Sequence, residues 1–267
     1  MRVIDCSEAG RPDPFLRVTA EEPADVPAVA AEHRMDVFIN ERPAMRLVCT
    51  PEHLDELAVG RLLTEGIASD VSEIREVYIC EQGLRARILV TDAAAARMEA
   101  VRAETVATCC TDNRTLVTGG LPLRAVEPLR WESSMLLELA ARLRGEDQPV
   151  YQATRAVHAC FLADKGGFLC GREDIGRHNA LDKAVGWAAM AGVDLRRCAM
   201  FTTGRMPMDM VTKAIRCGVP LLASKTCPTD RGIALAREYG LTLVTVRPDG
   251  ALWVWSDGAH PERSEET

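Results

Sequence analysis

The chain has 267 residues, of which 47% are hydrophobic and 27% charged, a composition typical of a soluble globular protein with one large domain or two ordinary ones. Its formal net charge of −7 excludes an overall positive field that would attract nucleic acid or anionic lipid, so an anionic ligand has to be bound locally. The N-terminal residues lack the apolar core of a signal peptide, and no run of about eighteen apolar residues is present to span a bilayer. We therefore expect a cytoplasmic protein with no nucleic-acid and no membrane partner.

The ten cysteines and five histidines are scattered along the chain. A chain of this length folds without disulfide bonds, and a reducing compartment keeps cysteines as thiols, so most are expected to be small buried hydrophobic residues. Neither a Cys-x-x-Cys sequence nor a pair of histidines at i, i+4 spacing occurs. We expect no metal site.

Residues 1–150 are predicted to form a smaller N-terminal α+β region. Two strand-like segments surround a turn, and a helix follows for which Thr50 is a good N-cap, Pro51 suits the first helical position and Gly66 is the stop. The apolar stripe of this helix is Leu54, Leu57, Ala58 and Leu62. The strands are predicted at 35–39 and 45–49, a hairpin at 74–80 and 85–90, and further helices at 92–103 and 131–143.

The segment TVATCCTDNRTLVTGG, residues 105–120, is predicted to be an irregular loop, and it carries the best candidates for a reacting group, Cys109 and Cys110. A cysteine reacts through its thiolate, which nearby Arg114 favours and Asp112 opposes. A disulfide between the two cysteines would be strained, because neighbouring Cα atoms are about 3.8 Å apart and relaxed disulfides need roughly 4.4–6.8 Å. The alternative is that both are loop cysteines without a role.

Residues 151–267 are predicted to form an α/β domain after a polar linker at 145–148. A hairpin at 157–163 and 168–172 precedes strands that alternate with helices, which predicts a sheet with parallel members and helices on both faces. In such sheets ligands bind beyond the carboxyl ends of the strands. The helices are predicted at 177–190, 208–216 and 229–239, and the strands at 198–203, 219–223 and 241–246.

Three strand ends in this domain carry polar sequence: GREDIGRHN at 171–179, TTGR at 202–205 and SKTCPT at 224–229. Glycines let the backbone approach a ligand, helix N-termini offer N–H donors, and basic side chains pair with phosphate, so the three ends predict a binding rim for a nucleotide-like anion. For each arginine taken alone, the alternative is that it is a solvated surface residue. His178 lies at the predicted start of a helix, where it can cap the helix, act as a titrating group or simply pack in the core. The candidate residues are Arg172, Gly176, Arg177, His178, Arg205 and Lys225.

Four parts of the sequence are distinctive: TPEHLDELAVGRLLTEGI at 50–67, GREDIGRHNALDKAVG at 171–186, TTGR at 202–205 with DMVTKAIRCG at 209–218, and LTLV at 241–244. Through these segments, and over nearly its whole length, the chain resembles the formate dehydrogenase accessory proteins of the FdhD type, which are sulfurtransferases acting on the molybdenum cofactor. The resemblance implies a cytidine-deaminase-like C-terminal α/β domain, a homodimer, and sulfur received as a persulfide from a cysteine desulfurase. The sulfur would pass to a molybdenum or tungsten bis-molybdopterin guanine dinucleotide, bound as substrate, for a formate dehydrogenase or related molybdoenzyme.

The resemblance also implies site residues. Cys109 matches the first cysteine of the family's Cys-x-x-Cys loop, Asp112 stands at the position of the second, and Cys110 is an additional thiol. The family's basic residue after a glycine corresponds to Ala251, for which Arg247 can substitute. The implied cofactor-binding stretch is Val246, Arg247, Pro248, Asp249, Gly250 and Ala251.

Two alternatives to sulfur transfer stay open. The altered cysteine loop favours a chaperone that binds the cofactor without transferring sulfur, and the paired thiols allow a general thiol-redox protein. Zinc-dependent deamination is not expected, because the His-x-Glu and Pro-Cys-x-x-Cys signature is absent and Cys227 precedes Pro228.

Overall fold

The computed structural model describes residues 1–6, 13–16, 28–99, 103–105, 115–117, 121–144 and 147–260. Its contacts divide the chain into two units, each of which takes several stretches of sequence. Unit 1 comprises Met1–Leu121, Pro149–Val157 and Glu173–Ala191, and unit 2 comprises Pro122–Gln148, His158–Arg172 and Gly192–Thr267. The expected division into residues 1–150 and 151–267 differs from these units, because 122–148 belong to unit 2 and 173–191 belong to unit 1.

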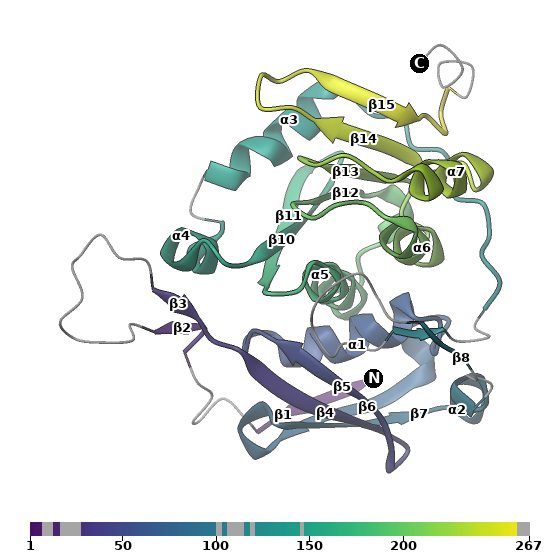
Figure 1. Cartoon of the computed structure of the whole chain (residues 1–267). Coiled ribbons are helices and arrows are strands. Elements are labelled where there is room, and N and C mark those ends of the chain that lie inside the picture. The colour runs from purple at the N-terminus through teal and green to yellow at the C-terminus, as the bar shows by residue number, and fades with distance from the viewer. Residues whose placement is uncertain are drawn as a thin grey trace. The chain divides into compact units, whose positions relative to one another are not determined.

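Unit 1 is built on a five-stranded sheet with the order β1-β6-β7-β4-β5 (Figure 1). The predicted hairpin at 74–80 and 85–90 is confirmed, since β6 pairs with β7 in antiparallel register. The two strand-like segments predicted around a turn form β4 and β5, which also pair in antiparallel register. The edge strand β1, parallel to β6, was not predicted. The main elements are β1 (Arg2–Asp5), β4 (His33–Ile39), β5 (Arg42–Cys49), α1 (Leu54–Thr64), β6 (Ile74–Cys80), β7 (Arg85–Val90), α2 (Asp92–Glu99), α4 (Pro149–Thr154) and α5 (Arg177–Ala191). Short pairs are β2 (Phe15–Leu16) with β3 (Val29–Ala30) and β8 (Ala103–Thr105) with β9 (Thr115–Val117).

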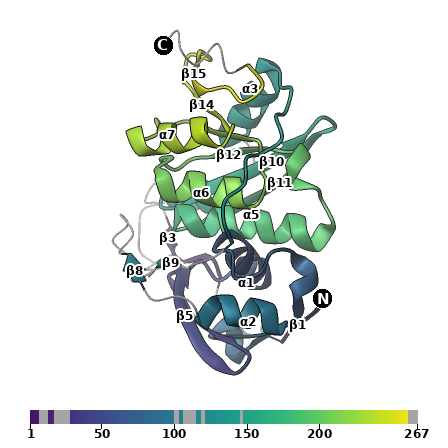
Figure 2. The ribbon, with the colours of Figure 1, turned by 90° about the vertical axis from the view of Figure 1, so that its right-hand side faces the viewer.

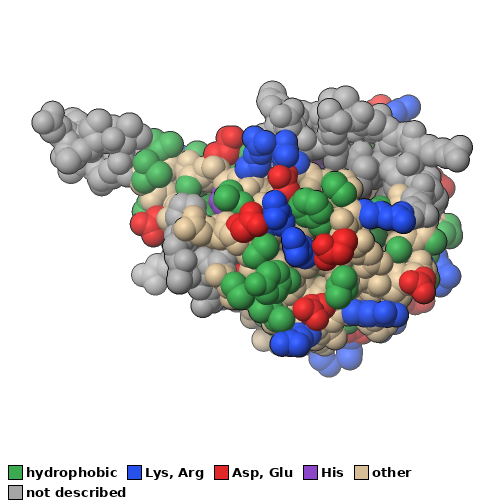
Figure 3. Space-filling model, turned by 90° about the horizontal axis from the view of Figure 1, so that it is seen from below, with side chains coloured by type: hydrophobic (Ala, Val, Ile, Leu, Met, Phe, Trp, Pro, Cys, Tyr) green, Lys and Arg blue, Asp and Glu red, His purple; other side chains and the backbone are tan. Residues whose placement is uncertain are grey.

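The two faces of this sheet differ because side chains alternate along each strand. One face carries the buried core with α1, to which the predicted stripe residues Leu54, Leu57, Ala58 and Leu62 contribute without solvent exposure. Figure 3 shows the lower surface of the molecule, where basic, acidic and apolar side chains are interspersed. On the outer side of β4 and β5, for example, Arg46 pairs with Asp36. A surface of mixed charge produces no single-sign field, in agreement with the composition.

Helix α1 begins at Leu54, and the prediction that Thr50 caps it was wrong. The N-cap residue is His53, which has left-handed backbone angles of φ 53° and ψ 45° and makes no side-chain capping bond. Thr50 is fully buried and is bonded instead to Asp174, whose carboxylate accepts its backbone N–H at 3.0 Å. A tertiary partner thus overrides a local capping preference. The predicted stop is confirmed, because Gly66 has a positive φ of 72° and ends the helix.

Unit 2 contains a six-stranded sheet with the order β11-β10-β12-β13-β14-β15. Strands β12, β13 and β14 are parallel to one another, as predicted, while β10 and β15 run antiparallel to their neighbours. Strand β15 was not predicted. The elements are α3 (Ser133–Ala141), β10 (His158–Asp164), β11 (Gly167–Asp174), β12 (Ala199–Thr202), α6 (Met208–Arg216), β13 (Leu221–Ser224), α7 (Asp230–Glu238), β14 (Thr242–Val246) and β15 (Leu252–Ser256).

Helices cover both faces of the unit 2 sheet. Leu136 and Leu139 of α3 pack in one cluster with Phe161, Phe201 and other residues of a single sheet face. Helices α6 and α7, which connect the parallel strands β12, β13 and β14, pack together on the other face, and Figure 2 shows them side by side. The mixed α/β class with helices on both faces is therefore confirmed. Among the described residues, no helix is both long and apolar enough to cross a membrane.

Candidate functional site

The cysteine loop is flanked by a short antiparallel ladder. Where the sequence predicted an irregular loop from residue 105, the structure pairs Ala103 with Val117 and Thr105 with Thr115. Cys109 and Cys110, with Asp112 and Arg114, lie outside the described residues. Their roles remain predictions.

The eight cysteines in the described part of the chain are all free thiols. Cys49, Cys160, Cys170 and Cys198 are buried, which confirms the expectation of buried thiols for these four. Burial raises the pKa of the Cys49 thiol far above its ordinary value, and it raises the pKa of Cys198 to about 11. Because the thiolate is the nucleophile, these two groups are unreactive at neutral pH.

Two of the three predicted strand ends meet at one edge of the unit 2 sheet. Thr202 and Ser224 are opposite one another at the ends of parallel β12 and β13. The Ser224 hydroxyl donates to the Gly204 carbonyl at 2.7 Å, and the Thr226 hydroxyl donates to the same oxygen at 2.8 Å. A further bridge joins Met206 and Pro228. These bonds hold the TTGR and SKTCPT turns together as a rigid rim.

This rim carries exposed groups of three chemical types: the guanidinium of Arg205, the ammonium of Lys225 and the thiol of Cys227. No hydrogen bond or ion pair ties Arg205 to another residue of the described part. Helix α6 begins just beyond Arg205, and its N-cap residue Pro207 supplies no side-chain bond. The first N–H groups of a helix together with a guanidinium suit a phosphate group. The rim can therefore hold an anion.

His158 is a rim residue that sequence reasoning missed. Its Nδ1 atom lies 3.2 Å from the hydroxyl oxygen of Thr203, which also accepts the backbone N–H of Ala159 at 2.9 Å. The Thr203 hydroxyl thus links the His158 ring to the backbone of β10. The position follows from the antiparallel pairing of β10 with β12, and a pairing of strands distant in sequence leaves no local signal.

The GREDIGRHNALDKAVG motif, the most specific sequence match, supplies a buried network within unit 1. Asp174 and Lys183 are both fully buried and form an ion pair at 2.7 Å. The Lys183 ammonium also donates to the Thr50 hydroxyl at 2.7 Å and to the Glu173 carbonyl at 3.2 Å. The Asn179 amide donates to Asp174 at 2.9 Å and to the Val48 carbonyl at 2.7 Å. Within unit 1, these polar residues join the end of β5, the segment Glu173–Asp174 and α5.

Glu173 connects the same network to α4. Its carboxylate accepts the backbone N–H groups of Val150 at 2.9 Å and Tyr151 at 2.8 Å. Burial raises the pKa of this carboxyl group above its ordinary range, although the two N–H donors act in the opposite direction. The desolvation of Glu173 therefore outweighs its hydrogen bonds.

The second half of the motif joins α5 to α1. Asp182 accepts a bond from the Arg61 guanidinium at 3.0 Å and from the Thr64 hydroxyl at 2.7 Å. The helix backbones approach so closely that a Cβ atom on Gly60 would lie 1.7 Å from the Asp182 carbonyl oxygen. A Cβ atom on Gly186 would lie 1.9 Å from the Glu56 carbonyl oxygen. Glycine is required at both positions of the crossing.

The remaining candidate residues fall into both units. Gly176, Arg177 and His178 belong to unit 1, where Gly176 donates its N–H to Asp174 at 2.9 Å and the other two side chains are buried. Arg172 belongs to unit 2 and donates to the Gly171 carbonyl at 2.9 Å. Ligand contact by these four residues remains a prediction.

The stretch Val246, Arg247, Pro248, Asp249, Gly250 and Ala251 forms the turn between β14 and β15. Gly250 has a positive φ of 83°, and Arg247 and Ala251 close the turn through a backbone bond of 2.9 Å. The Arg247 guanidinium pairs with Asp249 at 3.0 Å and lies 4.6 Å from the ring centroid of Trp253. A phosphate ligand would have to compete with Asp249 for this guanidinium.

Within the described residues, no group of three or more histidine, cysteine, aspartate and glutamate side chains is placed to hold a metal ion. The chemistry supported by the described residues is therefore anion binding at the unit 2 rim, with an exposed thiol at the same edge.

Comparison with known proteins gives concordant results. The model of the FdhD/NarQ family matches residues 30–263. A protein from Shouchella clausii named sulfur carrier protein FdhD is 31% identical over 235 residues, which cover 85% of this chain and 88% of that protein. A protein of the same name from Staphylococcus haemolyticus is 27% identical over 239 residues, with 88% and 89% coverage. A crystal structure of a protein from Desulfotalea psychrophila, described as a formate dehydrogenase accessory protein, matches with a TM-score of 0.67 and 28% identity, covering 89% of this chain and 90% of that one.

Proposed function

The chain belongs to the FdhD/NarQ family, and from this premise we propose that it is a sulfur carrier that receives sulfur from a cysteine desulfurase and delivers it to a molybdenum or tungsten bis-molybdopterin guanine dinucleotide. The names of its relatives, sulfur carrier protein, support the carrier role. The recipient cofactor, bound as substrate, would serve a formate dehydrogenase or a related molybdoenzyme.

The distribution of thiols supports Cys109 as the carrier residue. Of the described cysteines only Cys6 and Cys227 are exposed, and a buried thiol of raised pKa such as Cys198 cannot accept sulfur from another protein. By the resemblance, Cys109 matches the family's first loop cysteine, and Cys110 adds a neighbouring thiol.

The loading step is a thiol–persulfide exchange. The Cys109 thiolate attacks the terminal sulfur of the desulfurase persulfide, a new S–S bond forms on Cys109, and the S–S bond of the donor breaks. The desulfurase cysteine leaves as a thiolate. The exchange conserves electrons and needs no additional oxidant or reductant.

Intact-mass spectrometry after incubation with a cysteine desulfurase and cysteine tests this assignment. The wild type and the Cys110→Ala variant are expected to gain the mass of one sulfur atom, and Cys109→Ala is expected to gain none. Cys227→Ser is the matched control, because Cys227 is also exposed, and it should load normally. Sulfur that appears only on Cys110, or that is lost in Cys227→Ser, contradicts the assignment.

We propose that the cofactor's guanine nucleotide phosphates bind at the unit 2 rim, with Arg205 as their principal cation. The support is that Arg205 is exposed beside the start of α6. Calorimetric titration with GDP, which represents half of the cofactor, should show that Arg205→Ala weakens binding by about 1.5–3 kcal/mol, the contribution of a charged hydrogen bond. Arg124→Ala, which removes an exposed arginine before α3, is the control. If the affinity for GDP is unchanged in both Arg205→Ala and Arg172→Ala, neither arginine contacts the phosphates, and both are ordinary surface residues.

The competing function is a chaperone that binds the cofactor without transferring sulfur. The observation that favours it is Asp112 at the position of the family's second cysteine. GDP binding that persists while no persulfide forms on any cysteine identifies the chaperone, whereas GDP binding with loading of Cys109 identifies the sulfur carrier.

Three further parts of the proposal concern the protein as a whole. We propose a cytidine-deaminase-like arrangement for unit 2, supported by the parallel order β12-β13-β14 with α6 and α7 as crossovers. We also propose a cytoplasmic location, as the sequence analysis expects, and a homodimer, which the resemblance implies. Comparison of the unit 2 sheet with deaminase structures and measurement of the molar mass in solution test the fold and the dimer.

A further inference from the structure

Unit 1 places two cysteines beside one another at the edge of its sheet. Asp5 of β1 pairs with Ile79 of β6 in a parallel ladder, and this register, continued by one residue, sets Cys6 opposite Cys80. The backbone agrees, because the Cys6 N–H donates to the Ile79 carbonyl at 3.0 Å. In a parallel ladder an N–H bonds in this way to the residue that precedes its partner. Two thiols far apart in the chain are thus neighbours in the fold.

The two thiols also lie on the same face of this sheet. Successive side chains of a strand point to opposite faces. Val77 and Ile79 of β6 are buried in the core, and Val3 of β1 packs against it. By this alternation, Cys6 and Cys80 point to the opposite, outer face. Their exposure agrees, because Cys6 is exposed and Cys80 is partly exposed.

Tyr78 lies with the two thiols on this outer face. A hydrogen bond with Cys6 raises the pKa of the Tyr78 hydroxyl above its ordinary value, and the charges of the Cys6 and Cys80 thiolates act in the same direction. Burial raises the pKa of the Cys80 thiol, and the Cys6 thiolate adds to this effect, whereas Arg87 and Arg85 oppose it. Tyr78 and Cys80 therefore both sense the charge of Cys6.

The spacing of neighbouring strands suits a disulfide between these thiols. Paired strands lie about 4.8 Å apart, which is within the range of roughly 4.4–6.8 Å between the Cα atoms of a disulfide. The two Cβ atoms have to approach to about 3.5–4.5 Å, so the bond requires a small movement of the edge strand β1. Disulfides that are strained or exposed are easily reduced. The arrangement therefore suits a disulfide that forms and breaks, and not a permanent one.

We propose that Cys6 and Cys80 form a reversible disulfide when the protein meets a small disulfide such as oxidised glutathione. The exposed Cys6 thiolate attacks the glutathione disulfide, a mixed disulfide forms on Cys6, and one glutathione leaves as a thiolate. The Cys80 thiolate then attacks the Cys6 sulfur and displaces the second glutathione. Two protein thiols are oxidised, one glutathione disulfide is reduced, and the two thiol protons pass to the released glutathione molecules. The bond ties β1 to β6, and the proposal is independent of the sulfur-carrier function.

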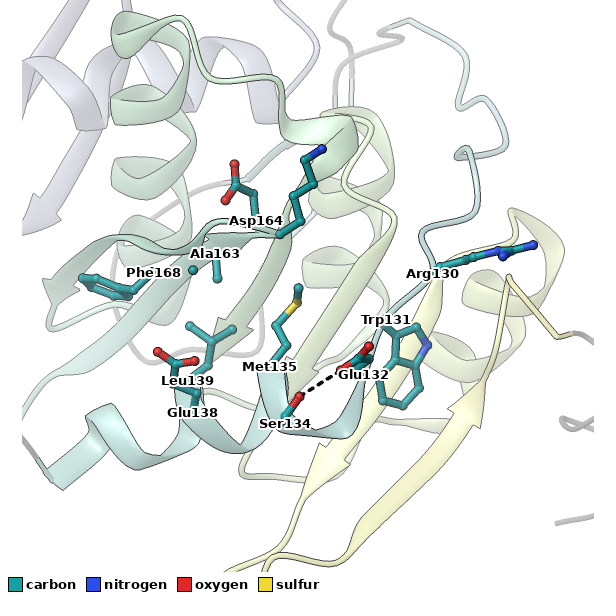
Figure 4. Close-up of a pocket in the computed structure, with 12 residues that line it drawn as sticks. Arg130, Trp131, Glu132, Ser134, Met135, Glu138, Leu139, Ala163, Asp164 and Phe168 are labelled. Atoms are coloured by element: carbon teal, nitrogen blue, oxygen red, sulfur yellow. Dashed lines mark hydrogen bonds between the residues drawn. The ribbon is translucent and has the colours of Figure 1, made fainter.

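Unit 2 supplies the reference thiol for a test. Cys227 is the exposed cysteine of this unit among the described residues. A pocket of about 310 Å³ between α3 and the β10–β11 hairpin, shown in Figure 4, is lined by no cysteine. A reagent that enters this pocket therefore meets no thiol. Uptake of glutathione by Cys227 shows that the reagent has acted on exposed thiols of the native protein.

The test treats the native full chain with oxidised glutathione, blocks the remaining thiols with iodoacetamide and digests the protein with trypsin. Trypsin releases residues 3–17 and 76–85, each with a single cysteine, so a disulfide-linked pair of these peptides identifies the bond. The linked pair should appear in the wild type and disappear when excess reduced glutathione is added. Cys80→Ser should lose the linked pair and retain glutathione on Cys6. Cys227→Ser is the matched control and should form the pair as the wild type does.

The proposal is overturned if Cys227 takes up glutathione while no linked pair forms. It is also overturned if Cys6 retains glutathione equally in the wild type and in Cys80→Ser, or if Cys6 links to a different cysteine. The same treatment in urea shows whether the fold joins the two thiols. If the unfolded chain yields as much of the linked pair as the native protein, the register of β1 and β6 is not the cause, and the proposal fails.

Discussion

Removing the charge of Lys183 should destabilise the protein strongly. Lys183→Met keeps the length and apolar character of the stem and removes the ammonium group, whose partners are Asp174 at 2.7 Å, the Thr50 hydroxyl at 2.7 Å and the Glu173 carbonyl at 3.2 Å. The Asp174 carboxylate, which has no solvent exposure, then stays buried without its cation. Breaking a buried pair in this way costs about 3–5 kcal/mol.

A loss of that size is a large fraction of the roughly 5–15 kcal/mol that stabilises a typical domain. Urea unfolding followed by circular dichroism measures it, and with a slope near the upper end of about 1–3 kcal/mol per molar urea the midpoint should fall by about 1–2 M. Lys165→Met, at an exposed position, is the control and should change stability by less than about 0.5 kcal/mol.

A double-mutant cycle separates the ion pair from simple damage to the core. In Lys183→Met with Asp174→Asn no unpaired charge is left buried, so the combined loss should be clearly smaller than the sum of the two single losses. A Lys183→Met loss below about 1 kcal/mol, or additive losses in the double variant, would refute the account of a buried pair that stabilises this junction.

The other predictions concern close packing, pH and thiol reactivity. Gly186→Ala should lower the free energy of unfolding, measured in urea, by about 1–3 kcal/mol. The new Cβ atom would lie 1.9 Å from the Glu56 carbonyl oxygen, and the cost of this clash outweighs the gain of about 1 kcal/mol in helix propensity. A more stable variant contradicts the close crossing. The pKa of Glu173 is raised in the folded state, so the stability linked to its protonation is present at acidic pH and lost as pH rises through the folded pKa. The unfolding temperature of Glu173→Gln, relative to that of the wild type, should therefore increase progressively above about pH 4.3. Parallel curves of unfolding temperature against pH for the two proteins refute this. Iodoacetamide should alkylate the exposed Cys227 in the native protein. It should alkylate Cys198, whose pKa burial raises to about 11, only after the protein unfolds. Peptide mass spectrometry measures both rates, and equal rates at the two cysteines contradict the prediction.

Local sequence predicted most of the regular elements because their signals are local. Helix α6 occupies 208–216 as predicted, with Gly218 at a positive φ of 73° beyond its end, and strands β6 and β7 match the predicted hairpin at both ends. Thr229 caps α7 through a bond from the Gly232 N–H. Periodicity, capping residues and glycine stops act within a few residues, so a single sequence contains them in full.

Predictions failed where a distant partner decides the structure. Thr50 is locally a good N-cap, yet its N–H and hydroxyl bond with residues more than a hundred positions away, and α1 starts later. Strands β1 and β15 are sheet edges defined by their pairing with β6 and β14, and short segments of this kind have weak propensity signals. His158 joined the rim only because β10 pairs with β12.

The sequence by itself determined the α/β class, the alternation of strands and helices from β12 to β14, the family motifs and the candidate thiols Cys109 and Cys110, because composition, periodicity and motif spacing are properties of the chain alone. Only the tertiary structure decided which polar residues are internal and which face solvent. Asp174, Asn179 and Lys183 of the GREDIGRHNALDKAVG motif are fully buried and bonded to one another or to Thr50, whereas Arg205 is exposed at the rim. The physical reason is that the same charged side chain can serve as a buried partner or as a ligand contact, and the choice depends on neighbours that are brought together only by folding.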